Sequence, residues 1–244
     1  MLHSTDRSYV SSAGSPAVRL YPSGKRVIDD MDYIADVLQT YESFIQPYEN
    51  ASALVQVWLE TMQKEVQEQY NHNPIHNIQG RIKSLSSIAE KLKRRGVPAG
   101  FDYAKDYLTD IAGLRVTCYY IQDVYVVIDN LKRQPGAIII KECDYIRHPK
   151  ENGYRSYHLI LGISLRQTGE YYPVEVQVRT LAMDFWASME HQLVYKSDRE
   201  DKEQLAAELR KYADALHSME RKMGDFYDGR EIRTEEKETN QEVG

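Results

Sequence analysis

Polar side chains alternate with valines in the segment 174–179 of the sequence. Because successive side chains of a strand point to opposite faces, one face of such a strand would carry Glu175, Gln177 and Arg179. An edge strand or a half-exposed strand with a solvated face would show the same pattern. That interpretation does not explain why the polar face continues into Thr180 and a helical segment with further polar residues. The segment is therefore also a candidate site for acid–base or metal chemistry.

A second acid, Asp110, stands at the start of another apolar, strand-like segment, residues 111–120. An acid in this place is often a simple turn residue. If the two strands were neighbours, however, Asp110 and Glu175 would form a two-carboxylate site. Such a site suits Mg²⁺, a hard ion that prefers oxygen ligands and also binds substrate phosphates. The sequence alone does not show that the strands are adjacent.

Cations and hydroxyl groups gather around the start of a predicted helix, at about 85–95. Free backbone N–H groups at a helix N-terminus favour phosphate, and basic side chains add charge-assisted hydrogen bonds. The candidate phosphate ligands are Arg81, Lys83, Ser87 and Lys91. A plain capped basic helix is the simpler interpretation, with capping candidates Ser84, Ser86 and Ser87, a capping box of Ser87 with Glu90, and a closing Gly96. No Walker A sequence occurs, so an ATP site here would not be a P-loop.

The segment 150–158 combines a turn with basic and aromatic side chains. Asn152 and Gly153 tolerate the left-handed backbone of a tight turn. Tyr154 offers a ring on which a base could stack. As an isolated stretch, the segment could also be an ordinary hairpin.

The elements that must position these residues alternate in an α+β order. Apolar periodicity predicts a helix over about 27–46 that Pro47 ends, and a second over about 51–70, together a helical hairpin. Residues 75–83 are expected to be short and extended. Further helices are predicted over about 85–95, 123–133, 181–196 and 202–227, and strands over about 111–120, 137–142, 157–165 and 172–179. The last two strands should pair antiparallel. This order predicts a mixed β-sheet flanked by helices, with helical extensions at both ends.

The 244 residues suffice for one domain, expected over 27–229, after a flexible lead-in at 1–26 and before a disordered tail at 230–244. The net charge of −6 argues against a protein that coats nucleic acid by charge alone. No apolar stretch is long enough to cross a membrane and no signal-peptide core is present, so a cytoplasmic location is expected.

Cys118 and Cys143 are expected to be buried thiols without a disulfide or metal role.

The terminal helices carry apolar stripes that one small sheet cannot cover, which predicts self-association. The stripes are Ile34, Leu38, Tyr41 and Ile45 in the first helix, and Leu205, Leu209, Tyr212, Leu216, Met219 and Met223 in the last.

Taken in order, four segments resemble the signature of the (p)ppGpp synthetase family, the synthetase half of the RelA/SpoT proteins and their small stand-alone relatives. The segments are GRIKSLSSIAEKLKRRG, DIAGLRV, HPKENGYRSYHLIL and VEVQVRTLAMDFWASMEHQLVYK, within residues 80–196. Since no His-Asp hydrolase region precedes them and no long regulatory region follows, the chain resembles the small alarmone synthetases. The resemblance implies a nucleotidyltransferase-like fold and a homotetramer built through the terminal helices. The stretch 97–106 looks longer than in relatives and is expected to shape a loop beside the ATP site.

The resemblance also implies an activity, the transfer of the β,γ-pyrophosphate of ATP to the 3′-hydroxyl of GDP or GTP, with (p)ppGpp and AMP as products. It implies that ATP binds to Arg81, Lys83, Ser87, Lys91 and Arg115, with Arg81 and Arg115 on either side of the adenine. Asp110 and Glu175 match the metal-binding acids, and Glu175 is also the candidate base. GDP or GTP would bind to Lys150, Asn152, Tyr154, Ser156 and His158, with Gln177 and Asp184 nearby and Tyr154 stacked on guanine.

Two alternatives stay open. The first is a transferase of the same fold that acts on another acceptor. The second is a catalytically silent nucleotide- or RNA-binding regulator, against which the retention of both Asp110 and Glu175 argues. No residue indicates the preference among GDP, GTP and GMP. None indicates the site at which an allosteric guanosine polyphosphate would bind between subunits.

Overall fold

The computed structural model describes residues 19–20, 26–27, 30–166, 168–195 and 201–227. The chain divides into two compact units, Met1–Phe44 and Ile45–Gly244. In the first unit, β1 (Arg19–Leu20) pairs antiparallel with β2 (Arg26–Val27). The rest of the predicted lead-in, and the whole predicted tail, lie outside the described residues. The prediction of one domain over 27–229 stays a prediction.

Helix α1 (Asp30–Tyr70) is continuous, so the predicted hairpin of two helices broken at Pro47 is wrong. A proline inside a helix removes one hydrogen bond and costs about 3 kcal/mol. Beyond it, however, α1 buries Tyr48, Val55 and Leu59 almost completely. Each such side chain contributes about 1.5–3 kcal/mol by leaving water, so packing outweighs the local cost.

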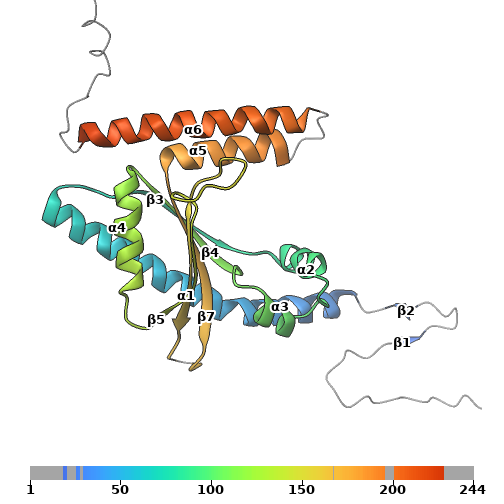
Figure 1. Ribbon diagram of the computed structural model, residues 1–244. Helices are drawn as coiled ribbons and strands as arrows, with labels where there is room; N and C mark the ends of the chain where they lie inside the picture. The colour runs from blue at the N-terminus through green and yellow to red at the C-terminus, as the bar shows by residue number, and fades with distance from the viewer. Residues whose placement is uncertain (1–18, 21–25, 28–29, 167, 196–200, 228–244) are drawn as a thin grey trace, which may run out of the picture. The chain divides into compact units, whose positions relative to one another are not determined.

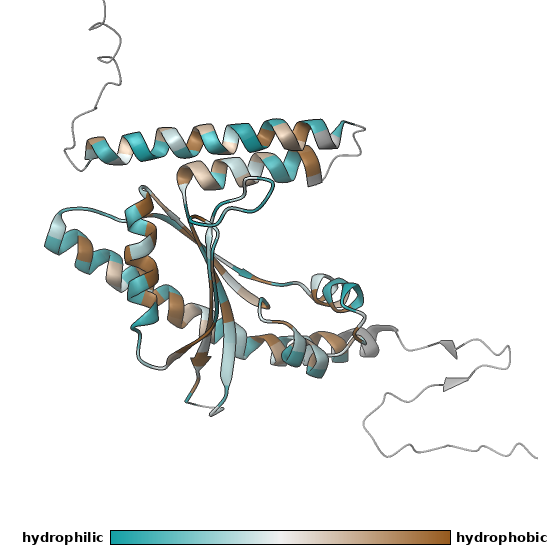
Figure 2. Ribbon diagram, in the orientation of Figure 1, coloured by the Kyte–Doolittle hydropathy of each residue, from teal (hydrophilic) through white to brown (hydrophobic). Residues whose placement is uncertain are grey.

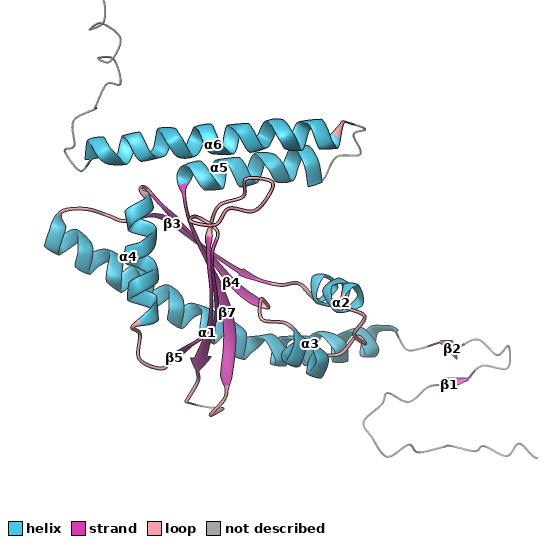
Figure 3. Ribbon diagram, viewed as in Figure 1, coloured by secondary structure: helices cyan, strands magenta, loops and turns pink. Residues whose placement is uncertain are grey.

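Five strands form the central sheet, in the order β3-β4-β7-β6-β5. Its strands are drawn in magenta in Figure 3. They are β3 (Ile75–Ile82), β4 (Ala112–Cys118), β5 (Ala137–Asp144), β6 (Tyr157–Ser164) and β7 (Tyr171–Thr180). Within this sheet β4 and β7 run parallel, and the other three neighbouring pairs run antiparallel. The predicted mixed sheet and the predicted pairing of its last two strands are therefore confirmed.

The helices after α1 are α2 (Leu85–Arg94), α3 (Phe101–Tyr107), α4 (Ile121–Lys132), α5 (Leu181–Glu190) and α6 (Lys202–Tyr227), and a π-helical turn, His191–Tyr195, extends α5. Helix α3 replaces part of the loop expected over 97–106. It is too short to show a clear apolar period, and the fully buried Ala104 and Leu108 anchor it. Along α1 and α6, hydrophobic and hydrophilic residues alternate (Figure 2).

One face of the sheet forms the core. The valines of β7 (Val174, Val176 and Val178) are fully buried, as are Leu159 and Leu161 of β6. Helix α4 lies along this face (Figure 1) and buries four apolar side chains, Val124, Val127, Ile128 and Leu131. Because β7 stands in the middle of the sheet, the interpretation of this segment as an edge strand is wrong, whereas the alternative of a half-exposed strand agrees with its burial.

Helices α5 and α6 pack side by side (Figure 1). Trp186 of α5, Leu209 and Ala213 of α6 form a buried cluster, and the Trp186 indole N–H donates to the Leu209 carbonyl at 2.7 Å. Part of the predicted α6 stripe is thus covered within the chain itself. Among the described residues, no helix is long and apolar enough to cross a membrane.

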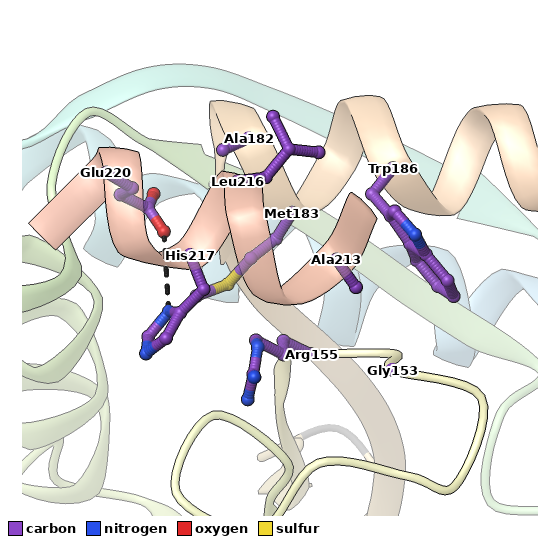
Figure 4. A pocket seen from close by; sticks show the side chains of 9 residues that line it. All are labelled: Gly153, Arg155, Ala182, Met183, Trp186, Ala213, Leu216, His217 and Glu220. Atoms are coloured by element: carbon purple, nitrogen blue, oxygen red, sulfur yellow. Dashed lines mark ion pairs between the residues drawn. The ribbon is translucent and has the colours of Figure 1, made fainter. Parts of the chain in front are cut away.

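Glu220 of α6 is an acid that is only 8% exposed. It borders a cavity of about 10 Å³, close to the size of one water, together with His217 and Arg155 (Figure 4). The His217 Nδ1 lies 4.0 Å from the Glu220 Oε2. Burial raises the pKa of Glu220 from 4.5 to about 7, although hydrogen bonding to Thr180 and the charge of Arg155 oppose that rise.

We predict that Glu220→Gln makes the fold less sensitive to pH. The folded pKa is raised above the unfolded one, so between about pH 4.5 and pH 7 the folded state binds more protons. The contribution of Glu220 to the free energy of unfolding should therefore fall as pH rises through this window, by up to about 3 kcal/mol, and Glu220→Gln should remove that contribution. Urea unfolding at pH 5 and pH 8 measures the free energy of unfolding. The control variant is Glu208→Gln, which changes an exposed acid on the same helix. Equal pH dependence in the wild type and Glu220→Gln would contradict the prediction.

Candidate active site

The face of the sheet opposite the core carries polar side chains over a cleft of about 480 Å³. The strand register places Gly113 of β4 between Arg81 of β3 and Glu175 of β7, and Arg115 beside Gln177. Since Gly113 has no side chain, space remains above the middle of the sheet. The cleft is lined by Gln79, Gly80, Arg81, Lys83, Asp110, Gly113, Leu114, Arg115, Glu175 and Gln177. The strands next to Asp110 and around Glu175 are therefore neighbours, as the two-carboxylate site required.

Asp110 lies two residues before β4 and meets two lysines. Its Oδ2 is 2.5 Å from the Lys91 Nζ and 3.1 Å from the Lys83 Nζ. Burial by itself would raise the pKa of Asp110, but the two lysines outweigh burial and lower it below its usual value. The Oδ1 is buried and has no hydrogen-bond partner within the part of the chain that the structure describes. One oxygen of an ionised carboxylate thus remains uncommitted.

Glu175 is held at both of its oxygens. Its Oε1 lies 3.3 Å from the His158 Nδ1, and its Oε2 accepts a hydrogen bond from the Gln177 Nε2 at 3.1 Å. Burial would raise the pKa of Glu175, yet the contacts with His158 and then Gln177 lower it below its usual value. Glu175 is therefore an ionised, oriented carboxylate at neutral pH.

The same polar network continues beyond Gln177 to helix α5. The Gln177 Oε1 accepts from the Arg179 Nη2 at 3.0 Å, and the Arg179 Nη1 lies 3.5 Å from the Asp184 Oδ1. Asp184 in turn lies 3.7 Å from the Arg115 Nη1. Arg179 is 3% exposed, and burial lowers its pKa. The sequence placed Arg179 on the polar face of β7 but assigned it no role in the site.

Helix α2 begins where the cations gather. Its N-cap is Ser84, whose Oγ accepts from the Ser87 backbone N–H at 3.3 Å. Because Ser87 lies inside the helix, the predicted capping box of Ser87 with Glu90 is wrong. Gly96 follows the helix with φ 68°, as expected for a closing glycine.

The loop 145–156, between β5 and β6, contains the predicted turn. The Asn152 Oδ1 accepts from the Tyr154 backbone N–H at 3.1 Å, and Gly153 has φ 92°. The Lys150 Nζ lies 4.8 Å from the ring centre of Tyr145 and 5.0 Å from that of Tyr154, at cation–π distance. The Tyr154 hydroxyl is 2.8 Å from the His158 Nε2. Through His158, the loop therefore reaches Glu175.

Burial limits how two loop residues could contact a nucleotide. Ser156 is fully buried and donates to the Val178 carbonyl at 3.2 Å, so its hydroxyl cannot contact a nucleotide in this conformation. It joins the loop to β7 instead. Tyr154 is partly buried against the Trp186 cluster, which leaves only part of its ring for stacking.

Comparison with known proteins gives the family. A family model described as "Region found in RelA / SpoT proteins" matches residues 80–200. The chain is 37% identical over 198 residues to the GTP pyrophosphokinase YwaC of Bacillus subtilis (strain 168), covering 80% of this chain and 94% of that protein. The chain belongs to the RelA/SpoT family.

Two further relatives agree with this assignment. Identity is 34% over 188 residues to the GTP pyrophosphokinase YjbM of the same organism, covering 76% of this chain and 88% of YjbM. A crystal structure of the small alarmone synthetase 1 from B. subtilis bound to its product pppGpp matches with a TM-score of 0.70 and 33% identity, covering 78% of this chain and 98% of that one. The expected α+β fold is thus the fold of small alarmone synthetases.

The cysteines of this RelA/SpoT-family chain are both free. Cys118 is buried in β4, as expected, whereas Cys143 of β5 is only half-buried. The described residues contain no group of three or more His, Cys, Asp and Glu side chains that could hold a metal ion. The absence of a metal role for the cysteines stays a prediction.

Proposed function

We propose that this protein transfers the β,γ-pyrophosphate of ATP to the 3′-hydroxyl of GDP or GTP, which yields (p)ppGpp and AMP. The observation that carries the proposal is the pair of ionised carboxylates, Asp110 and Glu175, in one cleft with the cations Arg81, Lys83 and Arg115. The GTP pyrophosphokinase names of YwaC and YjbM, and the pppGpp bound to a similar structure, support it. Nothing favours the silent alternative. The proposed place of action is the cytoplasm, where these nucleotides are abundant.

The triphosphate of ATP would lie along the cations of the cleft. Lys83 and Lys91 are already oriented by Asp110, and Ser87 stands in the first turn of α2, where free N–H groups favour phosphate. Such fixed positive charge stabilises the phosphoryl oxygens during transfer. The exposed guanidinium groups of Arg81 and Arg115 stand on adjacent strands of the same face, which suits a sandwich around the adenine.

The acceptor nucleotide would bind at the loop 145–156. The part-exposed ring of Tyr154 is the proposed stacking face for guanine. Lys150 supplies positive charge, and Asn152 shapes the turn. His158 touches Glu175, so the loop would bring the 3′-hydroxyl towards the carboxylate that takes its proton. Gln177 and Asp184 border the same place through the polar network.

Glu175 is the proposed base, although its lowered pKa makes it a weak one. A sugar hydroxyl is far less acidic than a carboxylic acid, so Glu175 would hold the proton only as the new bond forms. Its main contribution is orientation. Both of its oxygens are fixed by neighbours, and the hydroxyl is thereby aimed at the β-phosphorus.

Asp110 and Glu175 are also the proposed holders of Mg²⁺. The uncommitted Oδ1 of Asp110 is a carboxylate oxygen, the kind of ligand that a hard divalent cation prefers. Since the described residues contain no group of three or more His, Cys, Asp and Glu side chains that could hold a metal ion, water and phosphate oxygens would complete the shell. When bound, the ion neutralises charge on the phosphoryl oxygens.

Incubation with ATP, GDP and Mg²⁺ should yield AMP and ppGpp, separated by ion exchange. Glu175→Gln should lower that rate by about 100-fold or more, since the base and its orientation are both lost. Glu170→Gln, an exposed acid beside the same strand, is the control and should keep the wild-type rate. Absence of both products from the wild type would refute the proposed function, and near-wild-type turnover by Glu175→Gln would remove Glu175 from the mechanism.

Asp110→Asn should raise the Mg²⁺ concentration needed for half-maximal rate by about ten-fold, the effect of losing about 1.4 kcal/mol of binding energy. Added Mg²⁺ should restore part of the activity, because a weakened site still fills at higher concentration. Calorimetric titration of Mg²⁺ in the presence of a non-hydrolysable ATP analogue measures the binding directly. If the Mg²⁺ requirement of the variant matches that of the wild type, Asp110 does not hold the ion.

We propose a homotetramer, which is the assembly that the family resemblance implies. On α6 the residues Tyr212, Met219, Met223 and Phe226 are each more than half exposed, as is Leu38 on α1. Light scattering on a sizing column should give four times the chain mass of 28.3 kDa. Met219→Glu with Met223→Glu should lower that mass, because charges would enter an apolar interface. A monomer mass for the wild type would contradict the assembly. Clefts between subunits would be the place for an allosteric guanosine polyphosphate.

A further inference from the structure

Helix α6 contacts the loop 145–156 through a partly buried arginine. The Arg155 Nη2 donates to the Asp214 Oδ1 of α6 at 2.8 Å, and the Arg155 Nη1 donates to the Ile146 carbonyl at 3.5 Å. The Arg155 side chain is only 12% exposed, whereas Asp214 is 52% exposed. One guanidinium group therefore ties the beginning and the end of the loop to α6, and it projects into the cavity below this helix (Figure 4).

A second arginine strengthens this contact from the helix side. Arg210 of α6 donates to the Glu151 backbone carbonyl at the tip of the loop. Its Nε also lies 3.4 Å from the Asp214 Oδ2. The Asp214 carboxylate is thus shared between one arginine of the loop and one of the helix, and each of its oxygens has a cationic partner.

The loop also approaches α6 more closely than a side chain would permit. A Cβ atom added to Gly153 would stand 2.7 Å from the Ala213 Cβ and 3.0 Å from the Arg210 Cδ. Only a glycine fits this approach, and Gly153 also has the positive φ that favours glycine. The turn of the loop is therefore seated directly on the surface of α6.

The residues that α6 holds flank the proposed guanine-stacking ring. Tyr154 stands between Gly153 and Arg155, packs against the cluster of Trp186, Leu209 and Ala213, and joins His158 through its hydroxyl. Any movement of the loop away from α6 would therefore turn the Tyr154 ring and shift Lys150 beside it. The ATP side of the cleft, around Arg81, Lys83 and Asp110, is formed by other segments of the chain.

We infer that α6 positions the acceptor nucleotide: Asp214, through Arg155, holds the loop 145–156 in the conformation that presents Tyr154 and Lys150 to GDP or GTP. This inference rests on the proposed function. Asp214 and Arg155 act as positioning residues, since neither lines the cleft that holds the reacting groups. Breaking the Asp214–Arg155 ion pair should therefore weaken the binding of GDP or GTP and leave the binding of ATP unchanged.

The test uses the full chain with Asp214→Asn, and with Asp214→Glu as the conservative variant. Initial rates are measured against GDP at saturating ATP, and against ATP at saturating GDP. For Asp214→Asn we expect the KM for GDP to rise about three- to ten-fold, the effect of one part-exposed charge-assisted bond. The KM for ATP and the kcat should stay within about two-fold of the wild type. Asp214→Glu should recover most of the GDP affinity.

Glu208→Gln is the matched control, because Glu208 is an acid on the same helix that pairs with Lys211 and not with the loop. It should leave both KM values unchanged. Urea unfolding and the mass in solution, measured on each variant, separate a loop effect from loss of fold or assembly. An unchanged KM for GDP in Asp214→Asn, an equal loss toward both substrates, or the same rise in Glu208→Gln would overturn the inference. A wild type that makes no (p)ppGpp would instead refute the proposed function.

Discussion

Parallel pairing of β4 with β7 in the middle of the sheet is the interaction on which the site depends. It sets Gly113 beside Glu175 and brings Asp110, just ahead of β4, to the same cleft. The pairing is stabilised from the other face, where the valines of β7 and the apolar residues of β4 are fully buried. The burial of apolar side chains on one face thus fixes the positions of the charged groups on the other.

Placing charge on the middle of a sheet opposes folding, since burial disfavours ionised groups. The structure offsets that effect with a connected network: two lysines surround Asp110, and His158 with Gln177 holds Glu175. The same contacts that keep the carboxylates ionised also orient them. The contacts that stabilise the two charged carboxylates therefore also orient them for the proposed phosphoryl transfer.

The two sides of the proposed site differ in how they are supported. The ATP side is built from β3, β4 and the start of α2, which are regular elements of the sheet layer. The acceptor side depends on an irregular loop, which reaches the sheet through Ser156 and His158 and reaches α6 through Arg155. An irregular segment has few backbone bonds of its own, so its shape is set by the elements that it touches.

Local patterns in the sequence determined the strands of the central sheet, most helix limits, the turn at Asn152 and the four motifs that indicate the family, because each depends on near neighbours. The continuity of α1 through Pro47, the burial of Ser156 and the seating of Gly153 on α6 depended on packing between distant segments. Local propensity favoured a break at Pro47, and only the burial of residues beyond it reversed that preference. Adjacency of Asp110 and Glu175 likewise required the strand order, which is set by long-range burial that no short stretch of sequence contains.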